Sequence, residues 1–131
     1  MKNPSTYLRS LKAGYAELQQ VKHDPQALAA FLGRASQQGA STDLQAMIVL
    51  AMHRHADEPV ILRALSTVAR ADPHPRVRSA VATALGEMTN EQARALLDQM
   101  ATEDPDAGVR SNARYSLERL ANGTLPITAR N

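Results

Sequence analysis

An internal repeat constrains this chain more than any other feature of its sequence. When residues 65–88 are aligned with residues 97–120, a shift of 32 positions, eight of the 24 pairs are identical. A weaker third copy begins 33 residues upstream, with apolar residues at corresponding places. Self-similarity at a period of about 20 to 50 residues is typical of proteins in which one small unit stacks on the next. The sequence therefore predicts a stack of three similar units.

Each copy of the repeat has the pattern of two helices, because its apolar residues recur three or four positions apart. The six predicted helices span residues 25–36, 42–55, 59–71, 75–88, 91–103 and 107–120. Proline stands at or near several of the predicted starts, where its missing N–H group costs little. No useful stretch alternates between apolar and polar residues with period two, so no strand is expected.

Polar residues mark the predicted helix starts at nearly the same step as the repeat. Asp24, Asp57 and Thr89 are spaced 33 and 32 residues apart, and each precedes a helical pattern. Thr89 and Gln92 fit the capping box, in which both side chains accept backbone N–H groups. Asp24, Asp57 and Asp104 are accordingly interpreted as capping residues rather than as general acids.

A further helix is predicted ahead of the repeats, over residues 4–21, with Asn3 as its cap. Its apolar face consists of Tyr7, Leu8, Leu11, Tyr15 and Leu18. Residues 44–52 are apolar nearly all round and need cover on more than one side. We therefore expect the leading helix to cap the stack.

The predicted organisation is a single domain over residues 1–121, followed by a flexible tail over residues 122–131. The domain comprises the capping helix and three repeats, over residues 24–56, 57–88 and 89–121.

The two clearest copies share a short motif that identifies a family. Asp72-Pro73 and Asp104-Pro105 stand at the turn between the two helices, and Val77-Arg78 and Val109-Arg110 open the second helix. This pattern resembles HEAT repeats, most of all the short bacterial kind first noted in phycobilisome lyase subunits. The resemblance implies an all-α fold, a right-handed α–α superhelix of about seven helices. It also implies a concave face, lined by the second helices, that binds other macromolecules and chiefly proteins.

The first copy departs from the family motif at its two polar positions. Gly39 stands in place of the aspartate, and Gln45 stands in place of the arginine. In the family, this aspartate and arginine commonly pair within or between repeats. Asp72, Arg78, Asp104 and Arg110 are therefore interpreted as structural ion pairs rather than as ligand-binding groups.

The binding surface is predicted on the second helices. Candidate contacts for a protein partner are His53, Thr83, Glu87, Arg114, Tyr115 and Glu118. Tyrosine and arginine are the residue types that most often anchor protein interfaces. Tyr115 stands out because its counterparts in the other copies, Thr83 and Leu50, are not aromatic. The stacking of the repeats does not by itself require an aromatic residue there.

Composition excludes several classes of function. The 131 residues include no cysteine, which removes a disulfide scaffold, a thiolate metal site and a cysteine nucleophile. No phosphate-binding loop or dinucleotide fingerprint occurs, and no cofactor is expected. His53 and His55 lie two positions apart, so they point to different sides of a helix and predict no metal site. We therefore expect a non-catalytic adaptor in the cytoplasm, with no membrane segment.

Three alternatives to the adaptor stay open at this point. The net charge is only +2 and the excess lies in the first 56 residues, so contact with nucleic-acid phosphates is the minor interpretation. A non-catalytic subunit of a modifying enzyme, as in the lyases, is another. Self-association through the terminal repeat is the third, because an uncapped repeat can stack on another chain.

Overall fold

The computed structural model describes residues 4–122, with side chains from Leu8 onward. This part of the chain forms seven α-helices and one short 3-10 helix, with no strand, so the predicted all-α solenoid is confirmed. The helices are α1 (Pro4–Val21), α2 (Pro25–Gln37), α3 (Thr42–Ala51), η1 (Met52–His55), α4 (Pro59–Ala71), α5 (Pro75–Leu85), α6 (Glu91–Glu103) and α7 (Ala107–Ala121). The predicted cap Asn3 and the predicted tail beyond Asn122 lie outside the described residues.

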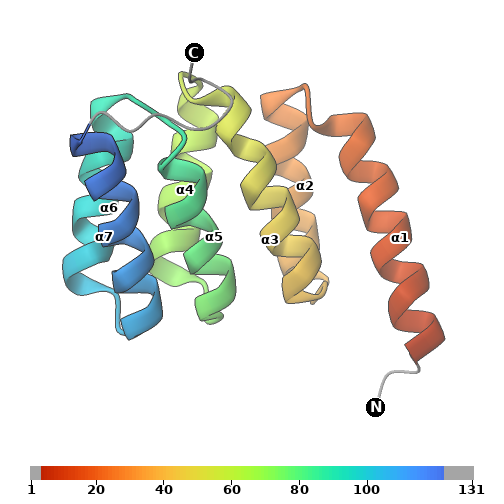
Figure 1. Ribbon diagram of the computed structural model, residues 1–131. Coiled ribbons are helices and arrows are strands. Elements are labelled where there is room, and N and C mark those ends of the chain that lie inside the picture. Colours follow the sequence, from red (N-terminus) through yellow and green to blue (C-terminus); the bar gives the residue numbers. More distant parts are fainter. Residues whose placement is uncertain (1–3, 123–131) are drawn as a thin grey trace.

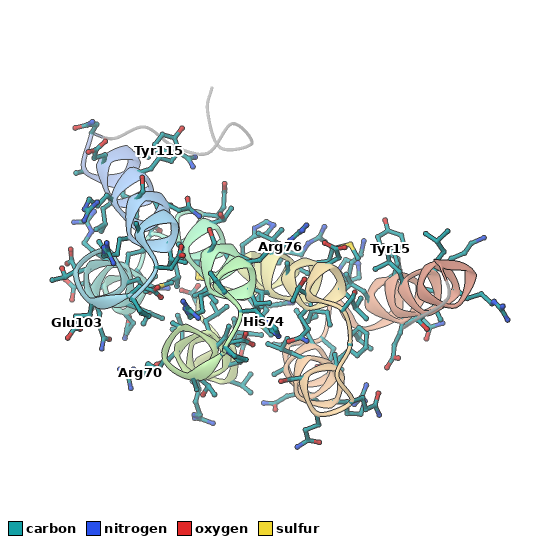
Figure 2. All side chains as sticks on the ribbon, turned by 90° about the horizontal axis from the view of Figure 1, so that it is seen from below. Tyr15, Arg70, His74, Arg76, Glu103 and Tyr115 are labelled. Atoms are coloured by element: carbon teal, nitrogen blue, oxygen red, sulfur yellow. The ribbon has the colours of Figure 1, made fainter. Side chains whose placement is uncertain are left out.

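The helices form two layers (Figure 1). The first helices of the repeats, α2, α4 and α6, make one layer, and the second helices, α3, α5 and α7, make the other. The second helices contact one another more extensively than the first helices do. The row of α1, α3, α5 and α7 is curved (Figure 2). The side of this row that faces away from α2, α4 and α6 is the concave face of the molecule. None of the described helices is long and apolar enough to cross a membrane.

One continuous apolar core runs between the two layers. Its largest fully buried side chains are Leu28, Ile48, Val49, Met52, Ile61, Leu65, Val77, Val81, Leu85, Met88, Leu97 and Val109. Burying one such side chain stabilises the fold by about 1.5–3 kcal/mol. Leu65 and Leu97, and likewise Val77 and Val109, are equivalent residues of neighbouring repeats. The repeated pattern in the sequence is therefore the pattern of the core.

Two helices end earlier than the apolar pattern predicts. The helix expected over residues 42–55 is α-helical only to Ala51 and continues as η1, because the last turn tightens and His55 bonds to the carbonyl oxygen of Lys22. The helix expected over residues 75–88 ends at Leu85. Gly86 follows it, and the tighter backbone bond from Glu87 N–H to Ala84 closes the turn.

The predicted caps are correct for α2 but wrong for α4 and α6. Asp24 accepts the backbone N–H groups of Gln26 and Ala27, as expected. Asp57 caps nothing, because Glu58 occupies the N-cap position of α4 without a side-chain bond.

The N-cap of α6 is Asn90 rather than Thr89, so the predicted capping box does not form. Asn90 accepts the N–H of Ala93, and its amide donates to the carbonyl of Ala56. Asp104 follows α6, but the cap of α7 is Asp106, which accepts the N–H of Val109.

The capping helix α1 lies against α2 and α3 as expected, but its orientation corrects the predicted apolar face. Leu18 is buried and Leu11 is half-buried, whereas Leu8 and Tyr15 are exposed. A Cβ atom on Gly14 would overlap the side chain of Leu44, so α1 approaches α3 through this glycine. That close approach turns the other half of the apolar stripe toward solvent.

Candidate functional site

A buried ion pair joins the second and third repeats. Arg78, on α5, donates from Nε to Oδ2 of Asp104 at 2.9 Å and from Nη2 to Oδ1 at 3.2 Å. Its remaining nitrogen, Nη1, donates to the carbonyl oxygen of Asp72 at 2.8 Å. Hydrogen bonding to Asp104 raises the pKa of Arg78 further above its ordinary value, although burial opposes this. The guanidinium therefore stays charged and links the end of α6 to the start of α5.

The equivalent positions of the other repeats keep only part of this arrangement. Arg110 donates to the carbonyl oxygen of Asp104 at 2.7 Å, and Gln45 donates to that of Ala40 at 2.8 Å. Thus each of the three side chains closes the turn of its own repeat, whereas Arg78 also reaches the next one. The carboxylate of Asp72 accepts the backbone N–H of His74 at 2.9 Å. The six-residue gaps in the motif are therefore bridged through carbonyl oxygens.

Directional bonds cross the boundary between α5 and α7 on the concave face. Asn112 donates to the carbonyl oxygen and the hydroxyl of Ser79 at 3.0 and 2.9 Å, and to the hydroxyl of Thr83 at 3.1 Å. Ser116 donates to the carbonyl oxygen of Ala82 at 3.1 Å. These bonds hold the two helices in register and fix the surface next to them.

A tyrosine and a charged pair stand beside that boundary. The guanidinium of Arg119 lies 5.7 Å from the centre of the Tyr115 ring, and its Nη2 lies 3.9 Å from Oε1 of Glu87. Cation–π contact and the neighbouring carboxylate both restrain Arg119. Tyr115 nevertheless leaves 60% of its surface open to solvent. This group offers a partner an aromatic ring in a defined position.

The six predicted contact residues do not form one patch. Thr83, Glu87 and Tyr115 come together along the α5–α7 boundary through the contacts of Asn112 and Arg119.

Arg114 lies on another side of α7, because at about 100° per residue it points about 160° away from Asn112, which faces α5. Glu118 lies about 60° around the helix from Tyr115 and one turn beyond it, so these two residues share a face. Both Arg114 and Glu118 are exposed. His53 is exposed in η1, which continues α3 and therefore lies away from α7.

The exposed large apolar side chains lie along the concave face. In the described part of the chain these are Leu8, Tyr15, Leu50 and Tyr115, with 61%, 51%, 38% and 60% of their surfaces exposed. Leu50 and Tyr115 occupy equivalent positions of α3 and α7. Tyr15 and Tyr115 point to the same side of the molecule (Figure 2). Leu8 precedes Tyr15 by seven residues and so shares its face.

Sequence reasoning identified Tyr115 in this set but missed the other three. The apolar pattern of residues 4–21 places Leu8 and Tyr15 on the core-facing side of α1. Leu50 aligns with Thr83 and Tyr115, so the repeat alignment already contained the signal that it lies on the open face.

No three histidine, aspartate or glutamate side chains among residues with described positions could together hold a metal ion. His55 Nε2 lies 2.8 Å from the carbonyl oxygen of Lys22, which joins the end of η1 to the end of α1. The candidate site is a curved surface with exposed aromatic and apolar side chains.

Paired helices stacked in two layers around a repeating core define an α-solenoid. The family model for HEAT repeats matches residues 28–118, from α2 to α7, and the chain belongs to this family. The match is to HEAT repeats as a whole and does not single out the lyase type. No curated protein and no solved structure matches the chain at a significant level.

Proposed function

We propose that this chain is a non-catalytic protein-binding module, an adaptor of the cytoplasm that holds its partner on the concave face. The observation that carries the proposal is that Leu8, Tyr15, Leu50 and Tyr115 are exposed on that one face. Figure 2 shows the two tyrosines on the same side of the molecule. Exposed apolar side chains that collect on one side of a protein mark interaction surfaces. Membership of the HEAT family supports the same conclusion, because its members generally serve as scaffolds for protein interactions.

The rigidity of the packed second helices makes this face suited to holding a partner. The second helices pack closely, and the bonds from Asn112 and Ser116 hold α7 against α5. A rigid surface loses little conformational entropy on binding, so more of the interaction energy appears as affinity. Tyr115, restrained by Arg119, is the best placed single anchor on the C-terminal side.

The experiment that tests the proposal is affinity capture from a lysate of the source organism, with and without nuclease. Three baits are compared: the natural chain, the double variant Leu50→Glu/Tyr115→Glu, and the control Ala30→Glu. Ala30 is exposed on α2, in the opposite layer, so the control adds a charge away from the concave face.

We expect proteins that the natural chain and the control retain equally, that resist nuclease, and that the double variant loses at least tenfold. Loss on nuclease treatment would instead support nucleic-acid binding. Equal retention by all three baits would remove the concave face from the site.

A further inference from the structure

Three of the four large apolar side chains exposed in the described part of the chain lie on α1 and α3. We call the apolar surface along the boundary between these two helices the α1–α3 strip and define it as Leu8, Leu11, Tyr15, Met47 and Leu50. Leu11 and Met47 are half-buried, and the other three are exposed. The strip differs from the α5–α7 boundary, where hydroxyl, amide and charged groups predominate.

The contact between Gly14 and Leu44 shows where α1 and α3 meet, and the two halves of the strip lie on either side of this contact. On α1, Glu17 pairs with Arg34 of α2 at 2.7 Å, so the side of the helix that carries Glu17 faces the layer of α2. The concave side of α1 therefore lies in the other direction around the helix from Gly14. Leu11, Tyr15 and Leu8 lie on that side, about 60°, 100° and 120° around the helix from Gly14.

The same reasoning places the residues of α3. Ile48, about 40° from Leu44, is fully buried and marks the core side of α3. Met47 and Leu50 lie about 60° and 120° in the other direction, toward solvent. The strip therefore borders the α1–α3 contact from both sides.

The dimensions of the strip match a short helix. With Gly14 level with Leu44 and the two helices running in the same direction (Figure 1), Leu8 lies about 9 Å below this level and Leu50 about 9 Å above it. The resulting length of about 18 Å equals about 12 residues of α-helix, or about three turns. One apolar face of such a helix presents three or four side chains at helical spacing, enough to cover the strip.

Two cations border the strip without a carboxylate partner among the described residues. Lys12 lies beside Leu8 on α1, and Arg54 lies one turn beyond Leu50 in η1, and both are exposed. The nearby carboxylate of Asp43 is already paired with Arg76 at 2.6 Å. The strip therefore carries a local excess of positive charge, which favours a partner with acidic groups beside its apolar face.

We propose that the α1–α3 strip binds an amphipathic helix of about three turns, whose apolar face is bordered by acidic residues, on a partner protein. This deepens the proposed function and rests on it. A second copy of the chain that docks through its own strip does not fit this description, because it would bring the same Lys12 and Arg54 to the strip. The apolar anchors provide affinity, and the two cations select the sign of the partner's charge.

The test is selection from a displayed library of random peptides, about 16 residues long, on the immobilised full chain. We expect enriched peptides that are net acidic and carry apolar residues at positions i, i+3 or i+4, and i+7.

A synthetic copy of the most enriched peptide is then titrated against variants by fluorescence anisotropy. Tyr15→Glu should weaken binding at least tenfold, and Arg54→Ala about two- to fivefold. The matched control Arg63→Ala removes an exposed cation from α4, in the other layer, and should leave the affinity unchanged.

The outcomes separate this proposal from the broader one. Enriched peptides that are neutral or basic, or an affinity that Arg54→Ala leaves unchanged, would overturn the acidic partner. Peptides that depend on Tyr115 but not on Tyr15 would overturn the strip while the concave face keeps its role as a binding module. If no peptide distinguishes the natural chain from Tyr15→Glu, the α1–α3 strip is not a helix-binding site. Affinity capture then decides the broader proposal by itself.

Discussion

Replacing Arg78 by alanine should destabilise the protein more than any other single truncation of a polar side chain. The carboxylate of Asp104 would keep its charge with only 2% of the side chain exposed, and the N–H of Asp106 would be its one remaining hydrogen-bond donor among the described residues. Removing one partner of a buried ion pair costs about 3–5 kcal/mol. Since domains of this size are stable by about 5–15 kcal/mol in all, a large part of the stability would be lost.

Arg110 supplies the matched control, because it occupies the same position of the next repeat. It also donates to the carbonyl oxygen at the turn, but it makes no ion pair with a following repeat. Arg110→Ala should therefore cost only the bond to the carbonyl, about 0.5–1.5 kcal/mol. The difference of about 2–4 kcal/mol between the two variants measures what the link between repeats contributes.

Urea unfolding followed by far-UV circular dichroism measures both variants. The double variant Arg78→Ala/Asp104→Ala should lose less than the sum of its single variants, by about 1–3 kcal/mol, because the orphaned carboxylate is gone. The raised pKa of Arg78 means that its charge stabilises the fold below its ordinary pKa and is lost only as the pH rises through the raised value. Equal losses for Arg78→Ala and Arg110→Ala would refute the reasoning.

Three further predictions concern local contacts, each measured by thermal or urea unfolding. Gly86→Ala should cost about 1–3 kcal/mol, because the new Cβ would lie 2.7 Å from Oγ of Ser116; an unchanged melting temperature would mean that Ser116 yields freely. Asn90→Ala should cost about 1–2 kcal/mol through the lost cap of α6. Gly33→Ala should add about 0.5–1 kcal/mol because the site is open and helical, whereas Gly39→Ala should destabilise because Gly39 has φ +68°.

The repeat predicts the helices well because both depend on the same local pattern. The bounds of α4 and α6 agree with the expectation at both ends, and α1 does as well. Apolar spacing reports which residues face the core, and proline or aspartate at a helix start acts within one turn. Where the information is local, as for Asp24 and α2, the sequence suffices to place it.

The exceptions with the largest effect depend on contacts between residues far apart in the chain. Asn90 replaces Thr89 as a cap, and its amide bonds to the carbonyl of Ala56, 34 residues away. The exposure of Leu8 and Tyr15 follows from the approach of Gly14 to α3, which no periodicity within α1 can reveal. The candidate site is the part that the sequence predicts least well. A surface on a solenoid is assembled from several helices, and the residues that it exposes depend on how each helix is rotated about its axis.

The unequal bonding of the two repeat boundaries has a mechanical consequence. The second boundary holds the bonds of Arg78, Asn112 and Ser116, which resist sliding because each requires a particular distance and direction. The first boundary is held mainly by apolar packing, with one exposed pair between Arg76 and Asp43. When the solenoid is bent, the boundary between the first and second repeats should therefore deform more than the boundary between the second and third. This more compliant boundary lies beside the α1–α3 strip, so a partner that bends the molecule would do so mainly there.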